Sequence, residues 1–198
     1  MTLLAPEPPH QAAEAVQSTF RAFAENGAFR SPALRNATGP LQLTEPQQVF
    51  TLGLDDLVAG RGLAAAKPTG WRYLVQEGDK VLATAETATT GPGGDHVFSA
   101  FNEGRLVASN ADAIRTARAL PEVSRGRFEL RLLRVPGLYV TALWIHEAQG
   151  VGDLLVPLAP SPVSAPAGRP IPAARLLEEL ASKARPAATV GPADRSGG

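Results

Sequence analysis

Two stretches of the chain repeat apolar side chains at helical spacing. Over 10–26 the apolar residues recur every three or four positions, which predicts a helix that ends at Gly27. Over 173–185 Leu176 and Leu180 belong to one apolar stripe, with charged residues on the opposite side. Both stretches are therefore predicted to be amphipathic helices that pack one face against a core.

Other segments follow the two-residue alternation of strands. A hairpin is predicted from 71–76 and 80–87, with its turn at Gly78 and Asp79. On this register Trp71, Tyr73 and Val75 share one face. Shorter strands are predicted at 48–52 and 96–101, and a helix is predicted from an N-cap at Asn110 to about Leu120.

The most regular alternation lies near the end of the chain. Residues 128–132, 138–146 and 154–158 are separated by short turns, which predicts a three-stranded meander followed by the helix at 173–185. The middle strand is apolar on both faces, so it should be central and covered twice. The fold class predicted is α+β: a mostly antiparallel sheet of about six or seven strands with three or four packing helices.

Proline placement indicates where the folded body lies. Most of the 18 prolines precede residue 47 or follow residue 156, and a packed sheet tolerates few of them. The interpretation is a disordered N-terminus at 1–9, one domain at 10–185 with its core at about 47–159, and a disordered tail at 186–198. No internal repeat is evident in the sequence.

Several segments resemble small actinobacterial proteins of unknown function. The resemblance rests on 70–75 (GWRYLV), on 128–146 (FELRLLRVPGLYVTALWIH) and on 154–160 (LLVPLAP). It covers roughly 47–185. It implies no activity, cofactor or catalytic residue.

Composition removes several classes of function. Nineteen basic and nineteen acidic side chains give a net charge of zero, which disfavours a general polyanion binder. The absence of cysteine excludes disulfides, thiolate metal sites and cysteine nucleophiles. The N-terminus lacks a basic signal region, and the longest strongly apolar run is too short to span a membrane. These features predict a cytoplasmic protein with no membrane partner.

Candidate chemistry centres on two of the three histidines. His96 begins a predicted strand directly after Asp95 and a glycine-rich loop. His146 ends a strand, with Glu147 next to it and Asp153 across the following turn. If the two histidines met across the sheet, a nearby carboxylate would complete a two-histidine metal site. The alternative is that both histidines are ordinary polar residues at strand ends. This alternative is favoured, because no standard catalytic motif accompanies them.

An arginine-rich stretch offers a second candidate surface. Residues 105–134 hold seven arginines against three acids, and Arg125, Arg127 and Arg131 suggest one basic face of the sheet. The aromatic side chains of an RNA-reading sheet are not predicted on that face. A segregated charge surface fits protein recognition better.

These observations favour a non-catalytic module that binds another protein or its own copy, with no cofactor. The expected binding residues are Arg125, Arg127, Arg131, Leu176, Leu177 and Leu180, the three leucines belonging to the helix at 173–185. The alternative is a small metal-dependent hydrolase that uses His96 and His146 with nearby carboxylates. A nucleic-acid binder is the third and least favoured hypothesis.

Overall fold

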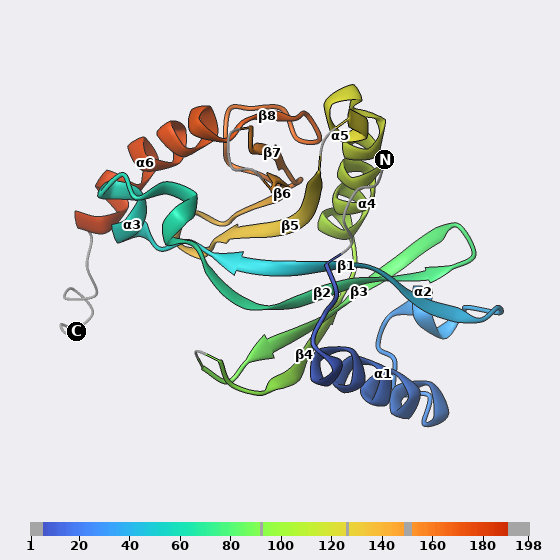
Figure 1. Ribbon diagram of the computed structural model, residues 1–198. Helices are drawn as coiled ribbons and strands as arrows, with labels where there is room; N and C mark the ends of the chain where they lie inside the picture. The colour runs from blue at the N-terminus through green and yellow to red at the C-terminus, as the bar shows by residue number, and fades with distance from the viewer. Residues whose placement is uncertain (1–5, 92, 126, 149–151, 190–198) are drawn as a thin grey trace, which may run out of the picture.

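The chain folds around a single mixed sheet (Figure 1). The computed structural model describes residues 6–91, 93–125, 127–148 and 152–189. Within them the eight strands lie in the order β4-β3-β2-β1-β5-β6-β7-β8. Every neighbouring pair is antiparallel except β1 and β5, which are parallel. The prediction of a mostly antiparallel α+β fold is confirmed, but the sheet is mixed and larger than expected, and the described residues form six α-helices where three or four were predicted.

The element bounds divide the chain into an alternation of strands and helices. The strands are β1 (Leu41–Thr51), β2 (Lys67–Glu77), β3 (Lys80–Thr89), β4 (His96–Asn102), β5 (Phe128–Val135), β6 (Val140–Glu147), β7 (Leu154–Pro157) and β8 (Ile171–Pro172). The α-helices are α1 (His10–Glu25), α2 (Pro32–Arg35), α3 (Leu54–Val58), α4 (Arg105–Ala119), α5 (Pro121–Arg125) and α6 (Ala173–Thr189). Two 3₁₀ turns, η1 (Gly62–Ala65) and η2 (Pro136–Leu138), follow α3 and β5.

The topology contains a repeat that the sequence does not reveal. Four antiparallel strands and a helix, β1 to β4 and then α4, are followed by β5 to β8 and then α6. The two halves meet at the parallel pair of β1 and β5, their first strands. The strands of the first half span 7 to 11 residues and those of the second 2 to 8, so the halves differ too much in length for self-similarity to stand out.

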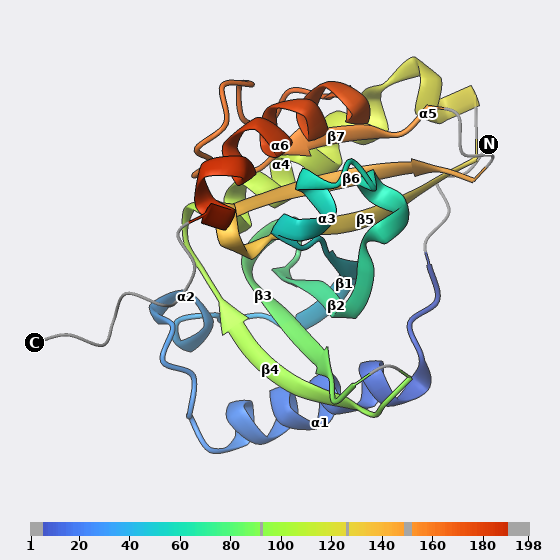
Figure 2. The same ribbon diagram turned by 90° about the vertical axis from the view of Figure 1, so that its left-hand side faces the viewer.

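Helices cover both faces of the sheet. Leu132 and Leu133 are neighbours on β5 and point to opposite faces. Leu132 packs with side chains of α4, whereas Leu133 packs with side chains of α3 and α6. We call these sides the α4 face and the α6 face. On the α6 face, α1 covers the first half, and Figure 2 shows α1 at one end of this face and α3 with α6 at the other.

Strand β1 begins earlier than the sequence predicts. The sequence predicts a strand only at 48–52, yet residues 41–47 belong to it as well. A register shift between Thr44 and Gln47 places Pro46 in a bulge, with Glu45 at φ 52°. Only Gln48–Thr51 pair with β5, so the missing N–H of Pro46 interrupts no bond of the parallel ladder.

Helix α4 also begins earlier than predicted. Its N-cap is Gly104 and not Asn110, which lies in the interior of the helix and is completely buried. Asn110 precedes Ala113, Ile114 and Ala117 on the stripe that packs against the sheet. A polar residue that resembles a cap in the sequence is therefore part of the helix–sheet interface.

The remaining predicted elements are found where they were expected. The hairpin, the meander and the two flanking helices are present, and Gly27 follows α1 in the left-handed conformation at φ 60°. Of the predicted disordered ends, 1–5 and 190–198 lie outside the described residues, whereas 186–189 continue α6, which corrects the prediction that the tail begins at 186. Among the described helices, none is long and apolar enough to cross a membrane.

A buried carboxylate ties the two halves together on the α4 face. Glu86 on β3 accepts hydrogen bonds from Arg72 Nε at 2.8 Å, from Asn102 Nδ2 at 3.0 Å and from Arg134 Nη2 at 2.7 Å. The side chains of Arg72 and Glu86 are 1% and 6% exposed, and that of Arg134 is 32% exposed. Because Arg134 lies on β5 and the other three residues lie on β2, β3 and β4, this ion cluster spans the junction between the halves.

The arginines keep Glu86 ionised despite its burial. Burial is the largest single effect and would raise the pKa of Glu86. The charges and hydrogen bonds of Arg72 and Arg134 act in the opposite direction and together hold that pKa below its ordinary value. The ion cluster consequently stabilises the folded chain at pH values where glutamate is ionised.

Glu86→Gln keeps the side-chain volume but leaves Arg72 buried without a counter-ion. We expect the free energy of unfolding at pH 7, measured by urea denaturation, to fall by about 3 kcal/mol. The exposed Glu14, which pairs with His10 on α1, provides the control, because Glu14→Gln should change the value by less than about 0.5 kcal/mol.

The same variants test the pH dependence. Because the pKa of Glu86 is lower in the folded than in the unfolded chain, its contribution is complete above the ordinary glutamate pKa, about 4.3, and disappears as the pH falls through the lowered value. Wild type and Glu14→Gln should therefore lose stability more steeply in acid than Glu86→Gln. Equal acid dependence in all three chains would contradict the role of the ion cluster.

Candidate functional site

A hollow lies on the α6 face, where α1 begins. It is a cavity of about 770 Å³, within the range of small-ligand pockets. We call it the α1 cavity. Its walls come from the start of α1, from β1, β2 and the end of β3, and from the loop that leads into β4. The lining residues are Pro9, Gln11, Gln48, Lys67, Pro68, Thr69, Gly70, Trp71, Thr89, Gly91, Gly93, Gly94 and His96.

The base of the α1 cavity depends on a close approach of two strands. Gly70 on β2 faces β3, and a Cβ at this position would collide with the carbonyl oxygen of Thr87. Trp71, the next residue, is buried and forms an apolar wall. Since rigid strands carry this part of the lining, the cavity belongs to the framework of the sheet.

His96 is the candidate histidine that the structure places in the α1 cavity. It is half-buried at the start of β4, where it pairs with Thr89, and its Nδ1 is buried without a partner among the described residues. Asp95 is exposed and does not line the cavity. No hydrogen bond between Asp95 and His96 is found in the described part of the chain, so Asp95 does not hold the imidazole.

His146 forms a different arrangement on β6. Its Nδ1 lies 3.1 Å from Asp153 Oδ1, and Asp153 also accepts hydrogen bonds from Trp144 Nε1 and from the backbone N–H of Glu147, both at 2.8 Å. The Trp144 and His146 rings meet edge to face at 5.3 Å. The structure therefore joins His146 and Asp153, as the sequence suggested, while Glu147 contributes only its backbone.

The two candidate histidines do not meet. His96 is on β4 and His146 is on β6, five strand-to-strand steps away in the sheet. At about 4.8 Å per step, the separation along the sheet is roughly 24 Å. Across the described residues, no group of three or more histidine, aspartate or glutamate side chains is placed to hold a metal ion. The alternative hypothesis of a shared two-histidine metal site is therefore wrong.

The predicted basic face is not built as expected. Arg125 ends α5 and its side chain lies outside the described residues, while Arg127 is exposed just before β5. The Arg131 guanidinium lies 5.0 Å from the ring centres of both Phe50 and Trp144 and bonds to Glu129 at 3.0 Å. Arg131 thus makes cation–π contacts and has a neutralising partner, whereas the sequence pattern placed it on a basic face of the sheet.

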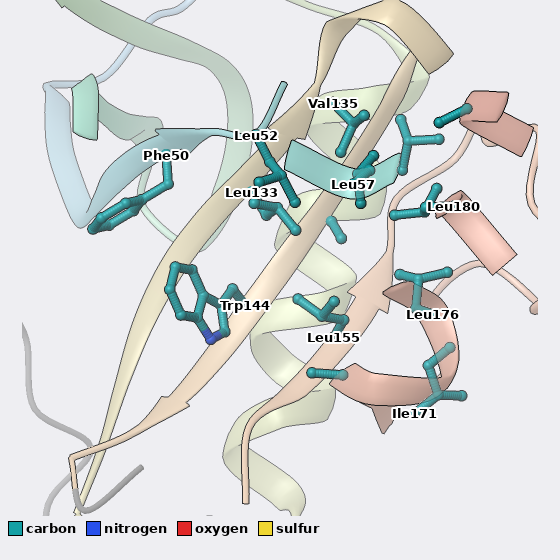
Figure 3. Packing of buried hydrophobic residues seen from close by; sticks show 14 residues of the cluster. Phe50, Leu52, Leu57, Leu133, Val135, Trp144, Leu155, Ile171, Leu176 and Leu180 are labelled. Atoms are coloured by element: carbon teal, nitrogen blue, oxygen red, sulfur yellow. The ribbon is translucent and has the colours of Figure 1, made fainter. Parts of the chain in front are cut away.

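The three leucines predicted for binding belong to the chain's own core. Leu176 and Leu180 are completely buried and point from α6 toward the strands (Figure 3), and Leu177 is half-buried against the same cluster. The amphipathic stripe was correctly identified, but the sheet of this chain covers it. A role for Leu176 and Leu180 at a partner contact is therefore corrected.

Comparison with known proteins adds no assignment. No protein-family model, curated protein or solved structure matches this chain.

Most residues of the α1 cavity were missed by sequence reasoning. The glycine-rich loop and His96 were noted as candidates, whereas Trp71 was predicted only as a face of the hairpin. Gln48 and Lys67 carry no motif, and Pro9 and Gln11 lie far away in sequence. Only the pairing of β1 to β4 and the packing of α1 bring them together.

Asp153→Ala tests whether this carboxylate anchors the end of β6. The substitution leaves the Trp144 indole N–H and the Glu147 backbone N–H without their acceptor, so the free energy of unfolding should fall by about 2–3 kcal/mol in urea denaturation. Asp112→Ala, which removes an exposed i,i+3 ion pair with Arg115, should cost less than about 0.5 kcal/mol. Equal losses in the two variants would contradict the anchoring role.

Proposed function

We propose that the chain is a non-catalytic binding module for another protein and that it holds its partner through the α1 cavity. The observation that carries the proposal is the cavity itself, a hollow of about 770 Å³ with Trp71, Pro9 and Pro68 among its walls. Binding energy at protein interfaces is concentrated in a few side chains that fill such pockets. An apolar side chain of the partner is therefore the expected anchor.

The neighbouring sheet surface suits a polar rim around that anchor. In register across four strands, Trp71, Gln48, Arg131 and Trp144 form one row on the α6 face. Gln48 lies in the α1 cavity and its neighbour Arg131 is partly exposed. Half-buried polar groups beside an apolar pocket are the usual surroundings of an interface anchor.

Filling the cavity should abolish partner binding. We expect native mass spectrometry of the untagged full chain, purified from its own host, to show a mass raised by a protein companion or a second copy. Gln48→Trp places a large ring in the cavity at a strand position that accepts aromatic residues. In this variant the fraction of the chain that carries the companion should be at least tenfold smaller than in wild type.

Gln42→Trp is the matched control, since Gln42 is exposed on the same strand and outside the cavity. It should keep the companion, and circular dichroism should show both variants folded. A bare monomer in wild type, or a companion retained by folded Gln48→Trp, would contradict the proposed function.

A hydrolase that uses His146 is the second candidate, favoured by one observation. The contact between His146 Nδ1 and Asp153 resembles the way a carboxylate orients a general base. Ester hydrolysis by the purified chain tests it: turnover of p-nitrophenyl acetate should fall at least tenfold in His146→Ala and stay unchanged in His10→Ala, whose histidine is exposed on α1. Wild-type protein without turnover above the uncatalysed rate would remove this candidate.

A further inference from the structure

The ionisable side chains that line the α1 cavity share one sign. Lys67 and His96 are the titratable residues of the lining, and none of the thirteen lining residues is an aspartate or glutamate. The other polar side chains, including Gln11 and Gln48, are neutral. In a mostly apolar hollow this set favours a ligand group with negative charge, because it offers a cation and no repelling carboxylate.

The N-terminus of α1 adds positive potential at the same place. Pro9 is the N-cap, it gives no side-chain capping bond, and the first turn has no acidic residue. Pro9 and Gln11 both line the cavity. The first N–H groups of a helix have no partner within it, and the helix dipole favours an anion beside them. The cavity thus combines an uncapped helix start with Lys67.

His96 also lines the cavity, at the start of β4. Its imidazole is a polar group that never carries negative charge, so it does not repel an anion. Its Nδ1 is buried without a partner among the described residues, so this atom is not itself open to the cavity.

From these three observations we infer that the α1 cavity binds the C-terminal residue of a partner protein, with its α-carboxylate toward Lys67 and the start of α1 and its apolar side chain against Trp71. The inference rests on the proposed function. A C-terminal residue such as leucine carries an apolar side chain and a carboxylate together, as this lining requires. An internal aspartate or glutamate supplies the charge without the apolar group.

The test is an NMR titration of the ¹⁵N-labelled full chain with acetyl-Ala-Ala-Leu as the free acid, with the same peptide as its amide, and with octanoate. The two tryptophans give separate indole signals. The indole of Trp71 should shift with the free acid together with the amides of Gly91 and Gly93, whereas that of Trp144, outside the cavity, should not. The peptide amide should bind at least tenfold more weakly.

Charge reversal at the cavity identifies the interacting group. Lys67→Glu should weaken binding of the free acid at least fivefold and leave the amide unchanged. Lys183→Glu makes the same charge change on α6 and should have no effect on either peptide. Both lysines are exposed, so both variants should fold.

The outcomes separate the inference from the proposed function. Equal binding of acid and amide, binding of octanoate without the peptide acid, or no shift at Trp71 would each overturn the inference. In all three cases, loss of the native companion in Gln48→Trp would still support the proposed function. Retention of the companion by that variant would instead remove the proposed function on which the inference rests.

Discussion

The parallel pairing of β1 with β5 is the constraint on which the rest of the structure depends. Only four residues of each strand pair there, Gln48–Thr51 with Arg131–Arg134, yet this ladder joins two four-stranded halves. A ladder of four pairs is short, and parallel pairing is slightly less stable per residue than antiparallel pairing. The bonds from Arg134 to Glu86 reinforce it from one face by reaching from the second half to β3 of the first. The junction therefore depends on a side-chain cluster as well as on backbone bonds.

This junction also explains why the two halves differ in what covers them. Helix α3 follows β1 at the end of the parallel ladder and packs against α6. A helix that belongs to the first half therefore covers part of the core of the second half. The first half is covered on the same face by α1, which begins beside the loop between β3 and β4. The α6 face is thus closed by leucines around α6 and hollow at the start of α1. A partner segment that enters the hollow need not disturb the leucine core.

Sequence patterns predicted the helices and strands that are determined by residues within a single segment. The hairpin, the meander, α1 and α6 each follow from a periodicity and a turn within one segment, and each is present.

The patterns did not predict features that depend on residues far away in the sequence. The first half of β1 was hidden because Pro46 reads as a strand breaker until the bulge is known. The start of α4 was misplaced because Asn110 has the chemistry of a cap and the burial of a core residue. The parallel pair and the strand β8, two residues long, leave no periodic signal at all.

The candidate site likewise depends on residues that are far apart in the sequence. For this reason, chemically reactive residues in the sequence did not identify it. His96 and His146 are the two histidines that a search for catalytic groups selects, but the junction places them in different halves. Each lies in separate surroundings: His146 is held by Asp153 at the end of β6, whereas His96 lies in a hollow whose other lining residues, apart from Lys67, are apolar or neutral. The residues that give the hollow its character, among them Lys67, Gln48 and the start of α1, have ordinary chemistry and become a site only through proximity. The proposed binding function relies on this combination, in which Trp71 offers apolar surface and Lys67 offers positive charge.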